Sequence, residues 1–165
     1  MHDQLLEKWR EDLSFTSLQR SPGETGAQLV TGLEGSQSSF FIAALSNSIS
    51  QPALVLTSDM AGAERLYEEI RAFLPEHEVY LFPGKDFFYT DEVLTQSKEI
   101  LQQRLKVLER LVLGKRIIVV APVPALFSKL TPVNFWKEKL LEIKAGLKIN
   151  WEAFLKRLVE MGYER

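Results

Sequence analysis

Residues 31–39 read TGLEGSQSS, and their spacing is that of a phosphate-binding loop, G-x-x-x-x-G-K-[ST]. In such a loop the backbone amides cradle the phosphates, the lysine neutralises their charge, and the hydroxyl ligates magnesium. Gly32 and Ser39 fall in place, but Gln37 stands at the second glycine and Ser38 at the lysine. The pattern therefore predicts a turn that connects a strand to a helix and has lost its nucleotide chemistry.

Two further features weaken phosphate binding by this loop. Glu34 adds a negative charge, and no apolar run of the chain ends in the Asp or Asp-Glu that would hold a metal ion. We expect no cofactor, no metal and no catalytic residue. A residual phosphate site at 32–39, helped by a basic residue such as Lys85 or Arg116, is the alternative. The candidate loop residues are Gly32, Glu34, Gly35, Gln37, Ser38 and Ser39.

A second candidate region lies at 83–96, where aromatic residues stand beside one lysine. Aromatic and basic side chains together can stack on unpaired bases. Three acids surround that lysine, however, so packing or a partner contact is the favoured interpretation. In the following helix, Arg104 is expected on a solvated face. The residues considered for a partner or nucleic-acid contact are Lys85, Phe87, Phe88, Tyr89 and Arg104.

Composition excludes several classes of function. The 165 residues contain no cysteine, so disulfides and thiolate chemistry are absent, and 20 basic against 22 acidic side chains create no global attraction to nucleic acid or membrane. His2 and His77 are isolated from other candidate ligands. No apolar run approaches the length of a membrane helix. We expect a cytoplasmic protein that does not contact a membrane.

Apolar runs and helical periodicities alternate along the chain. Strands are predicted at 27–32, 53–57, 78–82 and 116–122, with helices at 38–50, 58–74 and 98–114 between them. This alternation predicts an α/β fold, a three-layer parallel sheet with helices on both faces. Ligands of such sheets bind at the carboxyl ends of the strands, where we expect the loop at 32–37 to lie.

Helix ends and inward faces are also predicted. Ser58 or Asp59 should cap the second helix, and Gly114 should end the third. The inward stripes are expected to consist of Leu66, Ile70, Phe73 and Leu74 in the second helix, and Ile100, Leu101, Leu105, Leu108 and Leu111 in the third.

A boundary is predicted near residues 131–134, within the proline-bearing turn LTPVNFW. The stretch 137–149 alternates charged and apolar residues, as a half-exposed antiparallel strand or hairpin would, with a turn at Ala145-Gly146. Asn150 should cap a closing helix. We interpret residues 1–134 as one domain and 135–165 as the opening strand and helix of a second, α+β domain that continues beyond Arg165.

Four stretches, in this order, resemble the amino-terminal region of the bacterial transcription-repair coupling factor and, more distantly, the first domain of the excision-repair helicase UvrB. They are LVTGLEGSQSSFFIAAL, LFPGKDFFYTDE, RLKVLERLVLGKRIIVVAPVPALFSKL and LVEMGYER. The resemblance implies a RecA-like helicase fold, a degenerate phosphate-loop NTPase similar to UvrB domain 1. Gly32, Gln37, Ser38 and Ser39 match the decayed loop of that family.

The resemblance also implies a function. It points to a non-catalytic module of transcription-coupled nucleotide excision repair, which recruits the damage sensor UvrA, mainly through residues beyond Arg165, and restrains an ATP-driven DNA translocase elsewhere in the same protein. RNA polymerase and DNA would be contacted by other parts of that protein. Two alternatives stay open: a nucleotide- or DNA-binding helicase-like domain that uses 32–39, and a flavodoxin-like binding domain with a ligand in the same crevice.

Overall fold

The computed structural model describes residues 27–84, 93–139, 143, 145–146 and 148–161. The chain divides into two compact units, residues 1–129 and 130–165, and each is described by itself. The loop residues Lys85, Phe87, Phe88 and Tyr89 lie outside the described residues, as does the amino-terminal segment up to residue 26.

The first unit is built on a parallel sheet of three strands in the order β1-β3-β2. Strand β1 spans Ala53–Thr57, β2 spans Val79–Leu81 and β3 spans Ile118–Pro122. Ile118 of β3 pairs with Ala53 on one side and Val79 on the other. All five residues of β3 are buried. This confirms the prediction from its uninterrupted apolar run that the strand is covered on both faces.

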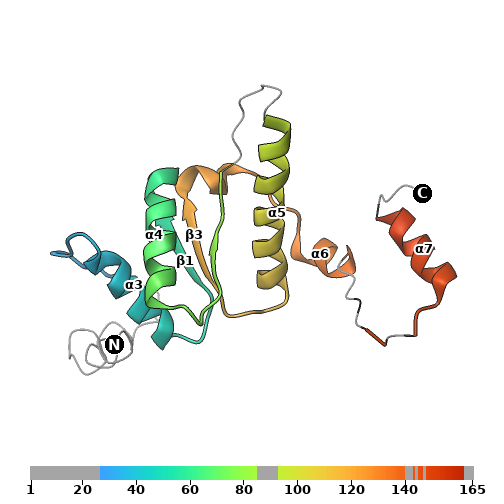
Figure 1. Ribbon diagram of the computed structural model, residues 1–165, viewed down its shortest axis with the longest axis horizontal. Coiled ribbons are helices and arrows are strands. Elements are labelled where there is room, and N and C mark those ends of the chain that lie inside the picture. The colour runs from blue at the N-terminus through green and yellow to red at the C-terminus, as the bar shows by residue number, and fades with distance from the viewer. Residues whose placement is uncertain (1–26, 85–92, 140–142, 144, 147, 162–165) are drawn as a thin grey trace. The chain divides into compact units, whose positions relative to one another are not determined.

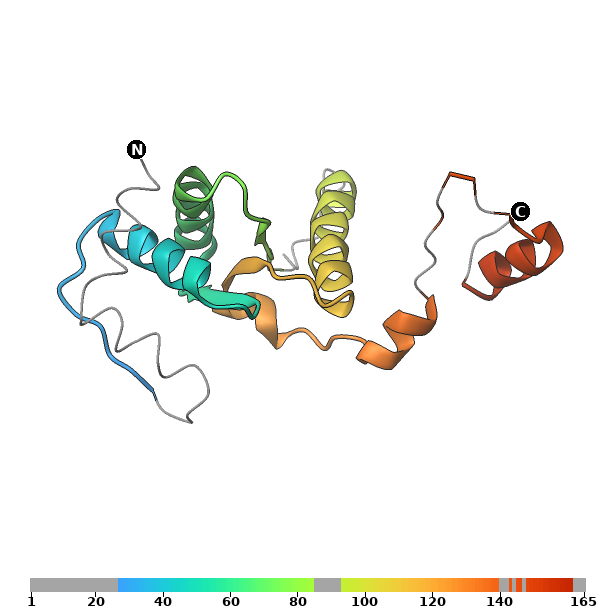
Figure 2. The same cartoon turned by 90° about the horizontal axis from the view of Figure 1, so that it is seen from below.

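Helices cover both faces of this sheet (Figures 1 and 2). Helices α3 (Gln37–Ser48) and α4 (Met60–Phe73) pack on one face, and α5 (Val93–Val112) and the 3-10 helix η1 (Val123–Phe127) pack on the other. The first core centres on Ile70 and Val120, and the second on Val107 and Val119. Burial of each such side chain contributes roughly 1.5–3 kcal/mol. The α/β prediction with helices on both faces is confirmed.

Polar residues define the helix ends as predicted. The Asp59 carboxylate accepts a hydrogen bond of 2.7 Å from the Gly62 N–H, so Asp59 rather than Ser58 caps α4. Gly114 follows α5 with a φ of 67°, and Lys115 N–H donates back to the Arg110 carbonyl at 3.0 Å. This left-handed glycine lets the chain turn into β3.

The strand predicted at 27–32 is not formed. Residues 27–34 carry no regular secondary structure, and the Leu29 side chain is 89% exposed. An apolar run becomes a strand only when a neighbouring strand takes up its backbone hydrogen bonds, and the described strands pair only with one another. The strands predicted at 53–57, 78–82 and 116–122 are present.

The inward face of α5 differs in part from the prediction, since Leu108 packs against the second core as expected but other members of the stripe do not. Leu101, Leu105 and Leu111 are exposed, whereas Arg104 and Val107 are buried against the sheet. Leucines recur around much of this helix, so periodicity alone did not single out the face that meets β2 and β3. The predicted stripe of α4 is confirmed, with Ile70 and Leu74 fully or almost fully buried.

The second unit contains helix α6 (Val133–Lys139) and helix α7 (Trp151–Glu160). The antiparallel strand or hairpin predicted at 137–149 is wrong for the residues that are described there, which form the end of α6 and irregular chain. The turn at Ala145-Gly146 is present, with Gly146 at a φ of 86°. Asn150 caps α7 as predicted, accepting from the Ala153 N–H at 3.2 Å.

Candidate functional site

The loop before α3 is closed by its own side chains. Gly32 and Gly35 adopt positive φ angles of 82° and 53°, which favour glycine. The Gln37 side-chain oxygen accepts a hydrogen bond of 3.1 Å from the Glu34 N–H, and the Gln37 N–H donates to the Glu34 carbonyl at 3.1 Å. One backbone amide that a phosphate loop would offer to its ligand is therefore bound within the protein.

Ser39 is fully buried, and its hydroxyl is also used internally. Its single O–H has two acceptors within hydrogen-bond distance, the Ser36 carbonyl at 3.0 Å and the Glu69 carboxylate of α4. In a working loop the hydroxyl at this position ligates magnesium. Here it joins α3 to α4, and the carboxylate beside it adds a negative charge near the loop. Sequence reasoning missed Glu69. The sequence marks it only as an acidic residue next to the apolar Ile70, which does not indicate a bond to Ser39.

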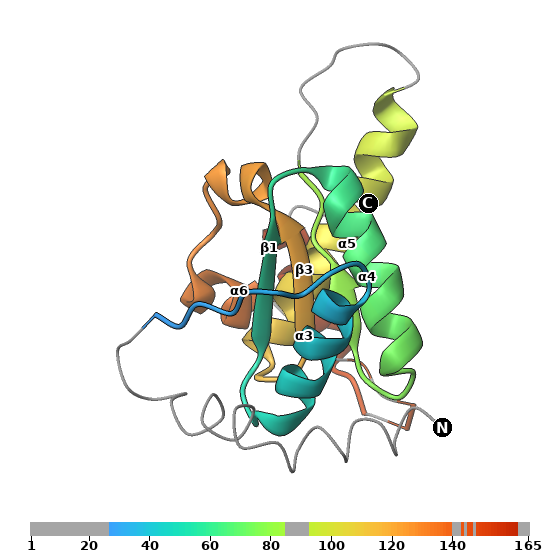
Figure 3. The ribbon, with the colours of Figure 1, turned by 90° about the vertical axis from the view of Figure 1, so that its left-hand side faces the viewer.

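The first turn of α3, into which the loop leads, lies against the last two turns of α4. Besides the bond from Ser39 to Glu69, the rings of Phe40 and Phe73 meet edge to face at 5.3 Å. Helix α4 starts at the carboxyl end of β1 and runs back toward the amino ends, so its last turns are remote from the carboxyl edge (Figure 3). The expectation that the loop lies at that edge is wrong, because the described residues that precede it, 27–34, form no strand of the sheet.

Arg116, which could have supplied charge to a residual phosphate site, is engaged at the other end of α3. Its guanidinium donates to the carbonyls of Ser46 at 3.0 Å and Asn47 at 2.8 Å. A basic group is favourable there because the last carbonyls of a helix carry partial negative charge. Ser38, at the lysine position, lies about two helical turns or more from that end, so Arg116 does not replace the lysine.

Arg104 is buried at the carboxyl edge of the sheet, and the expectation of a solvated face is wrong. Arg104 is only 3% exposed, and its guanidinium carbon lies 4.0 Å from the centre of the Phe82 ring. It donates to the Pro83 carbonyl at 2.6 Å and to the Ser128 hydroxyl at 2.6 Å. Burial lowers the pKa of Arg104. Carbonyl and hydroxyl oxygens, rather than a carboxylate, hold this cation in the described structure.

The carboxyl edge carries a hollow of about 510 Å³, between the ends of the strands and helices α4 and α5. Leu81 and Ile100 provide apolar surface, and Asp59, Glu64 and Glu99 provide carboxylates. None of the described residues that line it is basic. The hydrogen bonds from Gly62 and Ser58 lower the pKa of Asp59, which keeps its carboxylate charged. Sequence reasoning did not find this hollow, since its residues come from four separate segments.

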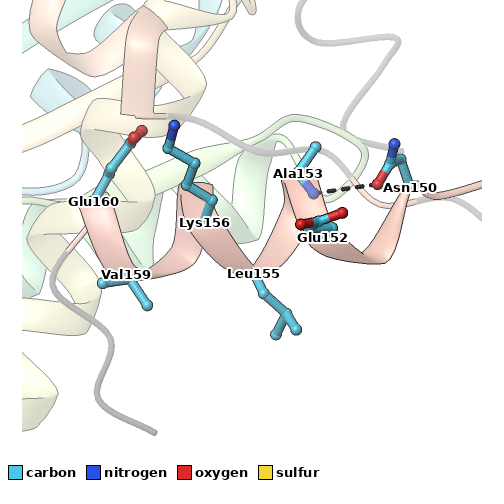
Figure 4. A pocket seen from close by; sticks show the side chains of 7 residues that line it. All are labelled: Asn150, Glu152, Ala153, Leu155, Lys156, Val159 and Glu160. Atoms are coloured by element: carbon cyan, nitrogen blue, oxygen red, sulfur yellow. Dashed lines mark hydrogen bonds between the residues drawn. The ribbon is translucent and has the colours of Figure 1, made fainter.

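The second unit offers a shallow hollow along α7. Leu155 and Val159 project from one side of the helix and Lys156 and Glu160 from the other, as Figure 4 shows. Trp151 is 67% exposed and meets Phe154 edge to face at 5.8 Å. The helix has no buried residue, so its apolar side is open to contact.

The described part of the chain holds neither a metal-binding cluster nor a membrane-spanning helix. No group of three or more His, Cys, Asp or Glu side chains could hold a metal ion there. Burial lowers the pKa of His77, which makes no metal-ligand cluster. None of the described helices combines the length and apolar character needed to cross a bilayer.

The fold and loop define a small α/β unit with a phosphate-loop-like turn before a helix. No family model matches the chain. It is 37% identical over 138 residues to the transcription-repair-coupling factor of Bacillus subtilis, covering 84% of this chain and 12% of that protein. It is 32% identical over 156 residues to the transcription-repair-coupling factor of Staphylococcus aureus, covering 94% of this chain and 13% of that protein.

These matches confirm the family resemblance. The chain corresponds in sequence to the N-terminal region of transcription-repair-coupling factors and spans only about an eighth of the length of those relatives.

Proposed function

We propose that this chain is the non-catalytic amino-terminal module of a transcription-repair coupling factor. In transcription-coupled nucleotide excision repair it acts as a scaffold that recruits UvrA and restrains the ATP-dependent DNA translocase of the full-length protein. The observation that carries the proposal is the internal use of the loop's ligand groups: the Ser39 hydroxyl is bound to Glu69 and the Glu34 amide to Gln37.

The loop also lacks what nucleotide hydrolysis requires, which supports a non-catalytic role. A phosphate loop needs a cation against the β and γ phosphates, a free hydroxyl for magnesium and an acid that holds the metal. Ser38 supplies no charge, the Ser39 hydroxyl already donates to Glu69, and Glu69 itself places a carboxylate where phosphate charge would accumulate. The module is therefore proposed as a degenerate RecA-like domain, similar to UvrB domain 1.

We assign different roles to the two parts of this chain and to the rest of the full-length protein. Residues 1–134 form the degenerate domain, and residues 135–165 open a second domain that provides the main UvrA-binding surface together with residues beyond Arg165. The exposed apolar side of α7, with Trp151, Leu155 and Val159, supports an interface in this part of the protein. RNA polymerase and DNA are contacted by other parts of the full-length protein.

The alternative, a residual phosphate site at 32–39, draws on one observation. Ser36 stands at the amino end of α3 but makes no side-chain capping bond, and the first turn of α3 carries no acid. Uncapped amides at a helix start attract anions. Within this alternative the loop would sense nucleotide without hydrolysing it.

Calorimetric titration with ATP and magnesium, repeated with ADP, separates the two functions. The scaffold proposal expects no saturable heat up to millimolar nucleotide. Saturable heat that is lost in Gly35→Trp, and kept in the control Gly114→Trp at a turn outside residues 32–39, would establish the alternative. Glycine replacement strains both positive-φ positions alike, so the control accounts for general destabilisation.

UvrA binding is tested separately by affinity capture with purified UvrA. We expect weak or absent capture of the 165-residue chain and strong capture of the full-length protein that carries it. Capture of the full-length protein that survives deletion of residues 1–165 and the next hundred or so residues would contradict the recruitment role, whatever the nucleotide result.

A further inference from the structure

We propose that the hollow at the carboxyl edge of the first unit is a docking site for a basic peptide segment, one that presents arginine or lysine between apolar side chains. The inference goes beyond the scaffold function, since it concerns a different surface from α7 and from the loop before α3. It rests on the position of the hollow, its lining and its charge.

The position is the one where α/β sheets bind their ligands. The strands β1, β2 and β3 all end at this edge, and the hollow of about 510 Å³ lies between their ends and helices α4 and α5. Its volume falls within the range of small-molecule and side-chain pockets. Each strand is followed here by a loop, and these loops diverge from one another. They leave space between the strand ends that is absent inside the sheet, where the strands pack side by side.

The lining accepts an apolar segment. Leu81, Ile100 and Pro124 contribute surface from β2, α5 and η1. Proline offers a carbonyl and no N–H donor, and both Pro122 and Pro124 line the hollow. The surface therefore presents more acceptors than donors to an incoming chain.

The charge at the rim selects a cation and disfavours phosphate. Asp59, Glu64 and Glu99 contribute three carboxylates, and none of the described lining residues is basic. The amino terminus of α4, which would otherwise attract an anion at this edge, already holds the Asp59 carboxylate on the Gly62 N–H. Arg104 lies close behind the hollow but is occupied by the Pro83 carbonyl and the Ser128 hydroxyl. A nucleic-acid backbone is thus repelled, and a basic segment is attracted.

The test is an NMR titration of the 165-residue chain with acetylated Leu-Arg-Leu-Arg-Leu amide. The matched probes are the same peptide with glutamine in place of arginine, and a single-stranded oligothymidylate. We expect saturable shifts of the amides of Ser58, Met60 and Gln103 with the arginine peptide, and none with the other two at millimolar concentration. Saturable shifts at these amides with the oligothymidylate, or none with the arginine peptide, would overturn the proposal.

Charge removal adds a second, independent measurement. The double variant Glu64→Gln and Glu99→Gln should weaken binding of the arginine peptide about five- to tenfold, as expected for two exposed charges. The control Glu76→Gln and Glu109→Gln removes the same charge from outside the hollow and should change binding by less than about twofold. Equal weakening in the two double variants would show non-specific attraction and overturn the site. All four side chains project from exposed or half-exposed positions, so both variants should fold.

Discussion

At the scale of single residues, two buried polar side chains hold the first unit together in ways that their residue types alone do not reveal. Ser39 joins α3 to Glu69 of α4, and Arg104 joins α5 to the segments that follow β2 and β3. Both make their hydrogen bonds inside the protein. Their contributions to folding can therefore be measured apart from any function.

Replacement of Ser39 by alanine should lower the free energy of unfolding by about 1–2 kcal/mol, because a buried donor to a carboxylate is lost. Urea denaturation of Ser39→Ala, Glu69→Ala and the double variant forms a cycle that isolates the bond. We expect a coupling free energy of about 1 kcal/mol. Additive effects of the two single variants would show that the bond does not stabilise the fold.

Replacement of Arg104 by alanine should cost about 2–4 kcal/mol, since the Pro83 carbonyl and the Ser128 hydroxyl lose their charged donor and Phe82 loses its stacked guanidinium. Lys106→Ala is the matched control, because Lys106 only approaches the Tyr80 ring at 5.4 Å from an exposed position. The control should stay within about 0.5 kcal/mol of the parent protein. Similar losses in both variants would argue against a specific role for the buried cation.

At the scale of elements, the ends of helices decide how the chain enters and leaves the sheet. Asp59 starts α4 directly after β1, Gly114 lets α5 turn into β3, and Arg116 binds the last carbonyls of α3. Each of these residues satisfies backbone groups that the helix itself leaves unpaired. Loss of such a residue should weaken one element rather than the whole core.

Stability should depend on pH through Asp59. The hydrogen bonds from Gly62 and Ser58 hold the folded-state pKa of Asp59 below its usual value of 3.8, so this contribution is present above the unfolded-state pKa and is lost as pH falls through the folded-state pKa. Asp59→Asn keeps the cap acceptor and should flatten the Tm profile below about pH 4. Asp59→Ala should lower Tm by about 2–4 °C at neutral pH. If the Tm of Asp59→Asn fell at acidic pH as steeply as that of the parent protein, groups other than Asp59 would cause the loss of stability in acid.

The loop before α3 should tolerate restoration of the phosphate-loop residues. In Ser38→Lys with Gln37→Gly, only the exposed bond from Glu34 to Gln37 is removed, so Tm should fall by no more than about 2–4 °C. Hydrolysis should stay absent because Ser39 remains bound to Glu69. ATP turnover in the double variant, or a much larger loss of Tm, would contradict this account of the loop.

At the scale of the whole molecule, the two units should differ in how firmly they are folded. Both hydrophobic cores and the acceptors of Arg104 lie between residues 40 and 128, whereas α7 has ten residues and none of them buried. Short helices without packed faces are marginal in water. In hydrogen exchange, we expect the amides of β3 to be the slowest and those of α7 to exchange many-fold faster.

A shortened chain ending at Lys129 tests the same point. It should keep cooperative unfolding with a Tm within a few degrees of the 165-residue chain, since the contacts that define the sheet and its two cores are retained. Loss of cooperative unfolding on this truncation would mean that the first unit depends on residues 130–165. The compact units of the structure divide between residues 129 and 130. The domain boundary at residue 134 stays a prediction.

Local chemistry in the sequence determined the α/β class, the strands at 53–57 and 116–122, the caps at Asp59 and Asn150, and the unusual loop at 32–39. These features depend on runs, periods and cap residues within a few positions of one another. The sequence also carried the family resemblance that the matches confirm.

Only the tertiary structure decided which apolar run joins the sheet, which face of α5 is buried, and what the polar residues bind. The stretch 27–32, predicted as a strand, finds no neighbouring strand among the described residues, and Leu101 is exposed while Arg104 is buried. The partner of Ser39 is 30 positions away, and the hollow at the carboxyl edge gathers residues between positions 58 and 124. Pairing, burial and charge at such distances depend on how whole elements meet, which no local pattern specifies.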